Sequence, residues 1–128
     1  MHLFQDPIEL RHRLHQFPEL MFREYKTTKI LIKNIEGIDN IKILRPLETG
    51  LIVEYKVNNG NFYLFRADID ALPIKEETGV SFASTNNFMH ACGHDVHTSI
   101  LYGLLRQVVA NKTNKNILFL FASSEIFR

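Results

Sequence analysis

The chain of 128 residues contains a single cysteine, six glycines and four prolines. One cysteine cannot form an internal disulfide, which fits a reducing compartment and excludes a disulfide-stapled secreted fold. The low glycine and proline content, together with 45% hydrophobic residues, indicates a globular chain rather than a low-complexity one. Its length is that of one ordinary domain with a buried core.

The sequence also lacks a long apolar run, a signal-peptide pattern and an excess of charge of one sign. Its formal net charge is +1, and Lys and Arg alternate with Asp and Glu along the chain. This pattern offers no basic stripe for nucleic acid and no polybasic patch for a membrane. We therefore expect a cytoplasmic protein with neither a nucleic-acid nor a membrane partner.

Apolar spacing predicts three helices. The first begins at Asp6-Pro7, where Asp6 can cap and Pro7 suits the first helical position, and it ends near Phe17. The second runs from about Glu24 to Ile35. The third is amphipathic and runs from Val96 to about Val109. Its apolar positions are Ile100, Leu101, Leu104, Leu105 and Val108.

Strands are expected between and after these helices. Residues 41–44 form a short strand candidate, and 51–57 and 62–65 are joined by the turn sequence Asn58-Asn59-Gly60, which predicts a hairpin. The apolar run 117–121 predicts a strand buried on both faces, whereas 74–88 is loop-like. Strand, helix and buried strand make a βαβ unit. The fold class is therefore α/β with a parallel or mixed sheet, in one domain over 1–128.

The nonapeptide Met89–His97 carries the most chemical information. It contains Cys92, His94, Asp95 and two further histidines, His90 and His97. Thiolate, imidazole and carboxylate are the side chains that bind zinc and similar cations. Cys92 and His94 are two residues apart before a helix N-terminus, so both can reach one metal, with Gly93 allowing unusual backbone angles. His90, Asp95 and His97 are expected close to these two ligands.

Two further acidic segments follow strands. Asp68 and Asp70 come after the strand that ends near Phe65, and Glu125 follows the strand that ends at Phe121. Ligands of α/β sheets collect outside the carboxyl ends of the strands, so we expect these acids to meet the nonapeptide at one rim. Asp68 and Asp70 could bind metal or orient the histidine ligands. Glu125 could act as a general base towards water.

Simpler interpretations stay open. The nonapeptide could be an ordinary helix start, with Asp95 as the cap, His97 in solvent and Cys92 as a small buried residue. Asp68 and Asp70 could be solvated acids, one of them paired with Arg66. Alternatively, Cys92 could be a nucleophile with His90, His94 or His97 as its base.

Three motifs in order resemble a known family. They are the stretch 11–24 with the sequence RHRLHQFPELMFRE, the stretch 66–79 that begins Arg-Ala-Asp-Ile-Asp-Ala-Leu-Pro, and 89–95; Thr49-Gly50-Leu51 adds to them. Together they resemble the N-terminal part of the metal-dependent amidohydrolases that include N-acyl-amino-acid amidohydrolases, hippurate hydrolases and auxin-conjugate hydrolases. The resemblance covers nearly all of residues 6 to 121.

The resemblance implies a zinc-aminopeptidase-like α/β catalytic domain with an inserted lid domain, and a pair of divalent cations, zinc or manganese. It implies hydrolysis of the amide bond of a small-molecule N-acyl amino acid. Cys92 and His94 fall on metal-ligand positions, and Glu125 falls on the general base. From the residues themselves we expect Asp70 to be catalytic beside Glu125, and Asp68 to support the site with His90, Asp95 and His97. Ile126 falls on the position of a glutamate ligand, and isoleucine cannot coordinate a cation.

The resemblance stops after Phe121. The family's two later histidine ligands and its lid domain, through which members usually dimerise, are absent from the sequence. We therefore expect an incomplete, truncated catalytic domain with weak or no activity. The oligomeric state is not implied. The alternative from another class is a non-enzymatic remnant of a longer gene.

Overall fold

The computed structural model describes residues 6–125. Two helices come first, then three strands, a third helix and a fourth strand, and residues 74–88 form a loop, as expected. No helix within these residues has the length and apolar character needed to cross a membrane. The elements are α1 (Pro7–Gln16), α2 (Tyr25–Ile35), β1 (Lys42–Leu44), β2 (Leu51–Tyr55), β3 (Phe62–Asp68), α3 (His94–Ala110) and β4 (Asn116–Ala122).

The first two helices begin through different capping arrangements. At α1, the Asp6 carboxylate accepts the backbone N–H of Glu9 at 2.9 Å, which confirms the predicted cap. At α2, Glu24 gives no side-chain cap. Instead Glu19, from the loop before it, accepts the backbone N–H groups of Lys26 and Thr27 at 3.0 and 2.6 Å. Glu19 thereby satisfies donors that the first turn of α2 leaves unpaired.

The four strands form one mixed sheet with the order β1-β2-β4-β3. β2 pairs antiparallel with β1 and β4, whereas β3 pairs parallel with β4. The predicted hairpin between 51–57 and 62–65 is therefore wrong, because β4 lies between these two strands. The βαβ unit of β3, α3 and β4 is confirmed, and it makes the class α/β.

The side chain of Asn116 explains why the turn after β2 does not close a hairpin. Its amide oxygen accepts the backbone N–H groups of Val57 and Asn58, at 2.7 and 3.1 Å. Its amide nitrogen donates to the carbonyl oxygens of Asn58 and Gly60, at 3.1 and 3.0 Å. The turn thus wraps around the start of β4, and its backbone groups are satisfied by a side chain instead of a hairpin ladder.

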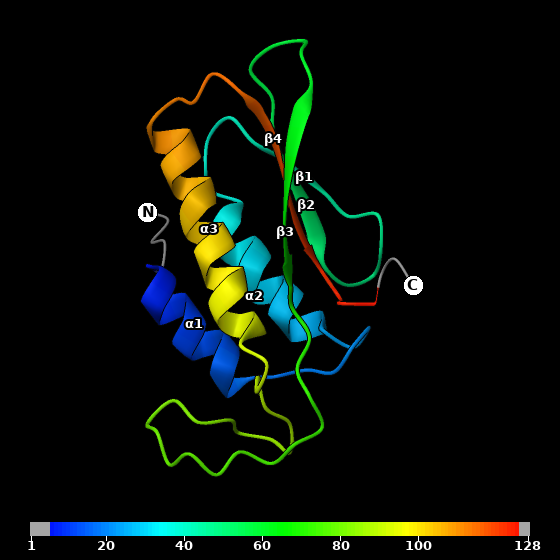
Figure 1. Cartoon of the computed structure of the whole chain (residues 1–128), viewed down its shortest axis with the longest axis vertical. Coiled ribbons are helices and arrows are strands. Elements are labelled where there is room, and N and C mark those ends of the chain that lie inside the picture. The colour runs from blue at the N-terminus through cyan, green and yellow to red at the C-terminus, as the bar shows by residue number, and fades with distance from the viewer. Residues whose placement is uncertain (1–5, 126–128) are drawn as a thin grey trace.

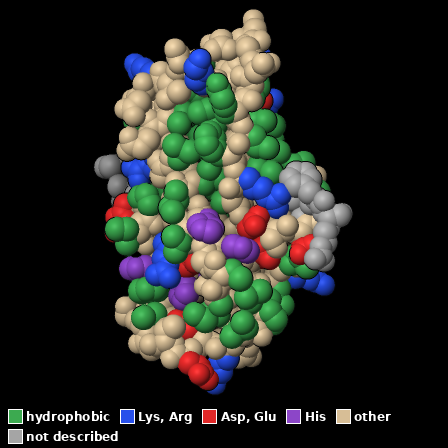
Figure 2. All heavy atoms as spheres, viewed as in Figure 1, with side chains coloured by type: hydrophobic (Ala, Val, Ile, Leu, Met, Phe, Trp, Pro, Cys, Tyr) green, Lys and Arg blue, Asp and Glu red, His purple; other side chains and the backbone are tan. Residues whose placement is uncertain are grey.

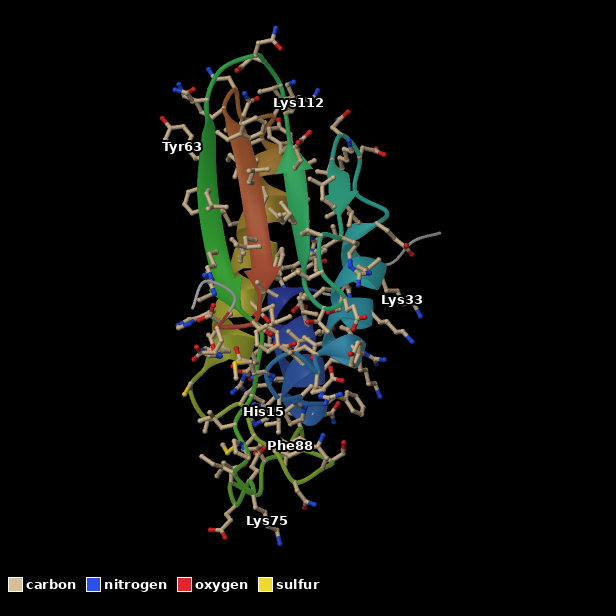
Figure 3. All side chains as sticks on the ribbon, turned by 90° about the vertical axis from the view of Figure 1, so that its right-hand side faces the viewer. His15, Lys33, Tyr63, Lys75, Phe88 and Lys112 are labelled. Carbon is tan, nitrogen blue, oxygen red and sulfur yellow. The ribbon has the colours of Figure 1, made fainter. Side chains whose placement is uncertain are left out.

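The helices lie together on one face of the sheet (Figures 1 and 3). The core fills the space between the two layers, and the burial expected for 117–121 is confirmed except at Leu118, which is half-buried. On α3 the buried face carries Leu101, Leu105 and Val108, but Ile100 is 63% exposed, which contradicts its assignment to that face. β3 is an edge strand, and its residues 62–65 are exposed.

Candidate metal centre

The carboxyl ends of β3 and β4 meet the N-terminus of α3 at one rim of the sheet. The Thr98 hydroxyl of α3 donates to the carbonyl oxygen of Asp68 at 2.9 Å. The backbone N–H of Ser124, after β4, donates to the Asp70 carboxylate at 3.0 Å, and the Ser124 hydroxyl donates to its other oxygen at 2.8 Å. Figure 2 shows histidine side chains next to acidic ones on this part of the surface. The predicted convergence of the three segments is therefore present.

His94 is oriented by the chain that follows β3. Its Nδ1 lies 2.8 Å from the carbonyl oxygen of Asp70, which can only accept, so Nδ1 carries the proton and donates. The lone pair is then on Nε2, which lies 3.9 Å from Oδ2 of Asp68. This backbone hydrogen bond fixes the tautomer that a metal ligand needs. Asp68 and Asp70 therefore both approach His94, the first by its carboxylate and the second mainly by its backbone.

Cys92 precedes His94 in a tight turn and is exposed. Gly93 has φ of 80°, a left-handed conformation that glycine adopts at little cost. The unusual backbone angle expected between Cys92 and His94 is therefore present. The alternative in which Cys92 is a small buried residue is therefore wrong.

Asp95 does not cap α3. The N-cap residue is Gly93, and no side chain makes a capping hydrogen bond at this end of the helix. The Asp95 carboxylate turns away from the rim instead, and its Oδ2 accepts from Arg11 Nε and bonds His15 Nδ1, both at 2.8 Å. It is 1% exposed. Asp95 thus joins α3 to α1 rather than facing His94.

His90 is 4% exposed, and neither of its ring nitrogens has a hydrogen-bond partner within the described residues. Burial lowers the pKa of His90 to about 4; the nearby Asp95 opposes this shift. The side chain is therefore a neutral imidazole close behind the rim.

His97 is exposed, as the simpler interpretation expected. It lines an open pocket of about 400 Å³ with Arg66, Ala67, Asp68 and Ser124. Arg66 pairs with Asp68, its Nε lying 3.0 Å from Oδ1, so that part of the simple interpretation is also confirmed. This pairing leaves Oδ2 of Asp68 on the side of His94.

Glu125 is half-buried and directly follows Ser124. The segment before it is held in place, because Arg66 donates to the carbonyl oxygen of Ser123 at 3.0 Å. The role expected for Glu125 stays a prediction. Ile126 lies outside the described residues.

Sequence reasoning missed a buried carboxyl group next to the rim. Glu24 is 0% exposed, and its Oε2 accepts a hydrogen bond from the Ser123 hydroxyl. Burial raises the pKa of Glu24, and the hydrogen bond from Ser123 only partly opposes it. The one signal for Glu24 was its place in the N-terminal motif, which does not reveal a contact with a residue 99 positions away.

These residues fit one part of a metal site. His94 Nε2 and Asp68 Oδ2 lie 3.9 Å apart, too far for a hydrogen bond, so each atom can still act as a donor to a metal. Cys92 is exposed on the same turn as His94. Among residues 6–125, however, no group of three or more His, Cys, Asp and Glu side chains is arranged to hold a metal ion. A complete site normally has at least three protein ligands. The described chain therefore offers a partial set.

Comparison with known proteins identifies this arrangement. Residues 64–125 match the model of peptidase family M20/M25/M40. A Bacillus subtilis protein described as a dinuclear metal-binding peptidase of the M20 family superposes with a TM-score of 0.86 at 40% identity, over 92% of this chain and 35% of that one. Over the length that it spans, the chain resembles proteins of the M20 family in sequence and in fold. This finding confirms the fold class and the resemblance.

Two curated relatives have the same name. N-acetyldiaminopimelate deacetylases of Bacillus cytotoxicus and Streptococcus gordonii are 45% and 44% identical, over 92% and 94% of this chain. The chain spans about a third of the length of these relatives, 32% and 33%. A putative aminohydrolase from methicillin-resistant Staphylococcus aureus gives a TM-score of 0.79 at 37% identity, over 91% of this chain and 32% of that one.

Proposed function

We propose that this chain carries part of the active site of a metal-dependent amidohydrolase that removes the acyl group from a small N-acylated amino acid. One observation carries the proposal. The Asp70 carbonyl fixes the His94 ring so that the Nε2 lone pair faces the carboxylate of Asp68. Such a backbone-oriented imidazole is the usual form of a metal-binding histidine.

Each candidate residue has a distinct role in this proposal. His94 and Cys92 would hold the metal, zinc or manganese, and Asp68 would lie beside His94. When bound, the metal would supply Lewis-acid activation of water and of the amide carbonyl. Glu125 would take a proton from water, and Asp70 would hold both His94 and the Ser124 segment before Glu125. The partial donor set predicts weak or no turnover by residues 1–128 alone.

The substrate class follows from the relatives' common name. An N-acetylated diamino acid such as N-acetyl-diaminopimelate is the first compound to test, with other N-acyl amino acids beside it. The pocket next to His97 contains the Arg66 guanidinium, but that group is already bonded to Asp68 and Ser123. The acyl and amino-acid preferences therefore stay open in the proposal.

Cobalt(II) titration tests the metal-binding part of the proposal. Wild-type chain should develop the near-ultraviolet absorption of a thiolate–cobalt contact, and Cys92→Ser should lose it. His94→Gln should weaken binding, whereas His12→Gln, on α1, should not. If millimolar cobalt gives no thiolate band with wild-type chain, the proposal is wrong. Release of amine from N-acetyl-diaminopimelate, with and without added manganese or zinc, then measures turnover.

The cysteine-nucleophile alternative has less support. His94 Nδ1 is hydrogen-bonded to the Asp70 carbonyl oxygen, His94 Nε2 lies 3.9 Å from Oδ2 of Asp68, and within residues 6–125 the His90 nitrogens have no hydrogen-bond partner. Turnover that resists chelators but is abolished by thiol alkylation would favour this alternative. A folded chain with neither turnover nor metal binding would favour the non-enzymatic one.

A further inference from the structure

A buried cluster of charged side chains lies directly behind the His94 turn and has no role in the proposed function. It consists of Arg11 and His15 on α1, Asp95 on α3 and Glu76 in the loop 74–88. The side chains of His15, Asp95 and Glu76 are at most 4% exposed. Figure 3 shows His15 at the end of the helical layer, next to the loop that carries Lys75 and Phe88.

Each ring nitrogen of His15 contacts a carboxylate. Nδ1 lies 2.8 Å from Oδ2 of Asp95, and Nε2 lies 2.9 Å from Oε1 of Glu76. A neutral imidazole has one N–H and one lone pair, so one of its nitrogens would face a carboxylate oxygen without a proton between them. Both short contacts can be hydrogen bonds from His15 only if both of its nitrogens carry a proton, and this geometry is the basis of the proposal below.

The alternative is a protonated carboxyl group on one side of the ring. Burial favours it at Glu76, but hydrogen bonds from Thr78, the Ser84 N–H and His15 outweigh burial and lower the pKa of Glu76. Asp95 Oδ2 contacts both Arg11 Nε and His15 Nδ1 at 2.8 Å, whereas its Oδ1 is buried without a hydrogen-bond partner among the described residues. With His15 charged, the cluster holds two cations and two anions, and each buried carboxylate has a cationic partner, as buried charges need; the Arg11 side chain is 29% exposed.

This cluster is mechanically linked to the turn that carries the candidate ligands. Asp95 and His94 are the first residues of α3 and point about 100° apart around the helix. His94 is held by the chain after β3, and Asp95 is held by α1. Because no side chain caps α3, these two tethers set the rotation of its first turn. Loss of the His15 contact would leave Asp95 held to α1 by Arg11 alone, from a side chain that is 29% exposed.

We propose that His15 is a buried imidazolium bridge between Asp95 and Glu76 and that this bridge positions the Cys92–His94 turn. His15 and Glu76 are then positioning residues, which act through Asp95 and do not touch the substrate. The proposal deepens the proposed function and rests on it, since the positioned turn is the one that would bind metal.

The charge state can be measured without any metal. Two-dimensional ¹⁵N NMR of the imidazole rings at pH 7 should show both nitrogens of His15 protonated. A lone-pair nitrogen shift at either position would overturn the bridge.

His15→Gln tests the positioning role against a matched control. Glutamine is uncharged and cannot donate to both carboxylates. His12→Gln is the same change one turn earlier on α1, where the ring stacks on Phe82 of the same loop, with centroids 3.8 Å apart, and is not part of the cluster. His15→Gln should weaken cobalt binding about tenfold, as for other residues that orient metal ligands. His12→Gln should change it by less than about twofold. Equal effects of the two changes would overturn the positioning role.

One further variant and one measurement without metal distinguish failure of the positioning role from failure of the proposed function. Glu76→Gln removes one carboxylate charge without a change of size, and it replaces His15→Gln if that variant does not fold; cobalt affinity equal to wild type would overturn the proposal. Amide hydrogen exchange of Val96 and His97, whose N–H groups bond the Gly93 carbonyl, reports the turn without metal. If wild-type chain binds no cobalt, the proposed function fails, and faster exchange in His15→Gln than in His12→Gln still supports the bridge. Equal exchange in both overturns it.

Discussion

His90 makes the stability of the fold depend on pH in a way that one substitution can isolate. The ring is buried, lacks a hydrogen-bond partner in the described part of the chain, and has a pKa lowered to about 4 from an ordinary 6.5. As pH falls from 6.5 towards 4, the unfolded chain takes up a proton at His90 that the folded chain does not. The His90 contribution to stability is therefore present above pH 6.5 and is lost as pH falls.

The size of this effect follows from the two pKa values. Between pH 7.5 and pH 4.5, proton linkage at His90 should lower the free energy of unfolding by about 2.5 kcal/mol. His90→Leu replaces the imidazole with an apolar side chain of similar size and so removes the titrating group. The free energy of unfolding of His90→Leu should therefore fall by about 2.5 kcal/mol less than that of wild type over the same interval.

Urea denaturation at the two pH values measures this difference. His97→Leu, the same change at an exposed position of the same nonapeptide, corrects for the general effect of replacing histidine by leucine. Because the comparison is between pH values, the cost or gain of the leucine side chain itself cancels. If wild type and His90→Leu lose the same free energy within about 0.5 kcal/mol, the reasoning is wrong, and His90 must be hydrogen-bonded in solution.

Three further predictions concern other parts of the fold. Because burial raises the pKa of Glu24, its folded-state cost grows as pH rises above the ordinary value, so Glu24→Gln should raise the melting temperature more at pH 8 than at pH 4. Gly50→Ala should lower the free energy of unfolding, measured by urea denaturation, by well over 1 to 2 kcal/mol, because φ is +79° and a Cβ would lie 2.5 Å from a β4 carbonyl oxygen. Gly79→Ala, with φ of +72° and open space around the Cβ, should lower it only by the cost of the left-handed conformation. Leu64→Lys, on the exposed edge strand β3, should reduce self-association in analytical ultracentrifugation. Asn61→Lys, just outside the strand, should reduce it less. Equal effects of the two changes would show that the added charge, and not the strand edge, is responsible.

The sequence predicted those elements whose signals are local. The Asp6-Pro7 start of α1, the buried run of β4 and the periodic α3 each depend on residues within one turn or one strand. The hairpin prediction failed for the opposite reason. Alternating residues and a turn do predict that two strands are near each other, but they do not exclude a third strand between them. Asn116, which organises that turn, lies 58 residues from Asn58.

The same distinction applies to the candidate site. The meeting of Asp68, Asp70 and His94 followed from strand order and the helix start, which are coarse properties of a βαβ unit. The roles of Asp95 and His90 did not follow, because they depend on α1 and on the loop 74–88. Neighbours that are 80 residues apart, such as His15 and Asp95, leave no periodic pattern in the sequence.

Several residues that make the family resemblance specific hold the rim together and do not themselves face the candidate metal position. Glu19 caps α2, Gly50 allows β2 to pass a β4 carbonyl group, and His15 ties α1 to the start of α3. A chain can therefore keep these motifs because its fold needs them, even where the described residues provide few metal donors. For this reason the family resemblance supports the architecture of the rim more directly than it supports turnover. The proposed metal binding by Cys92 and His94 is what would connect this architecture to turnover.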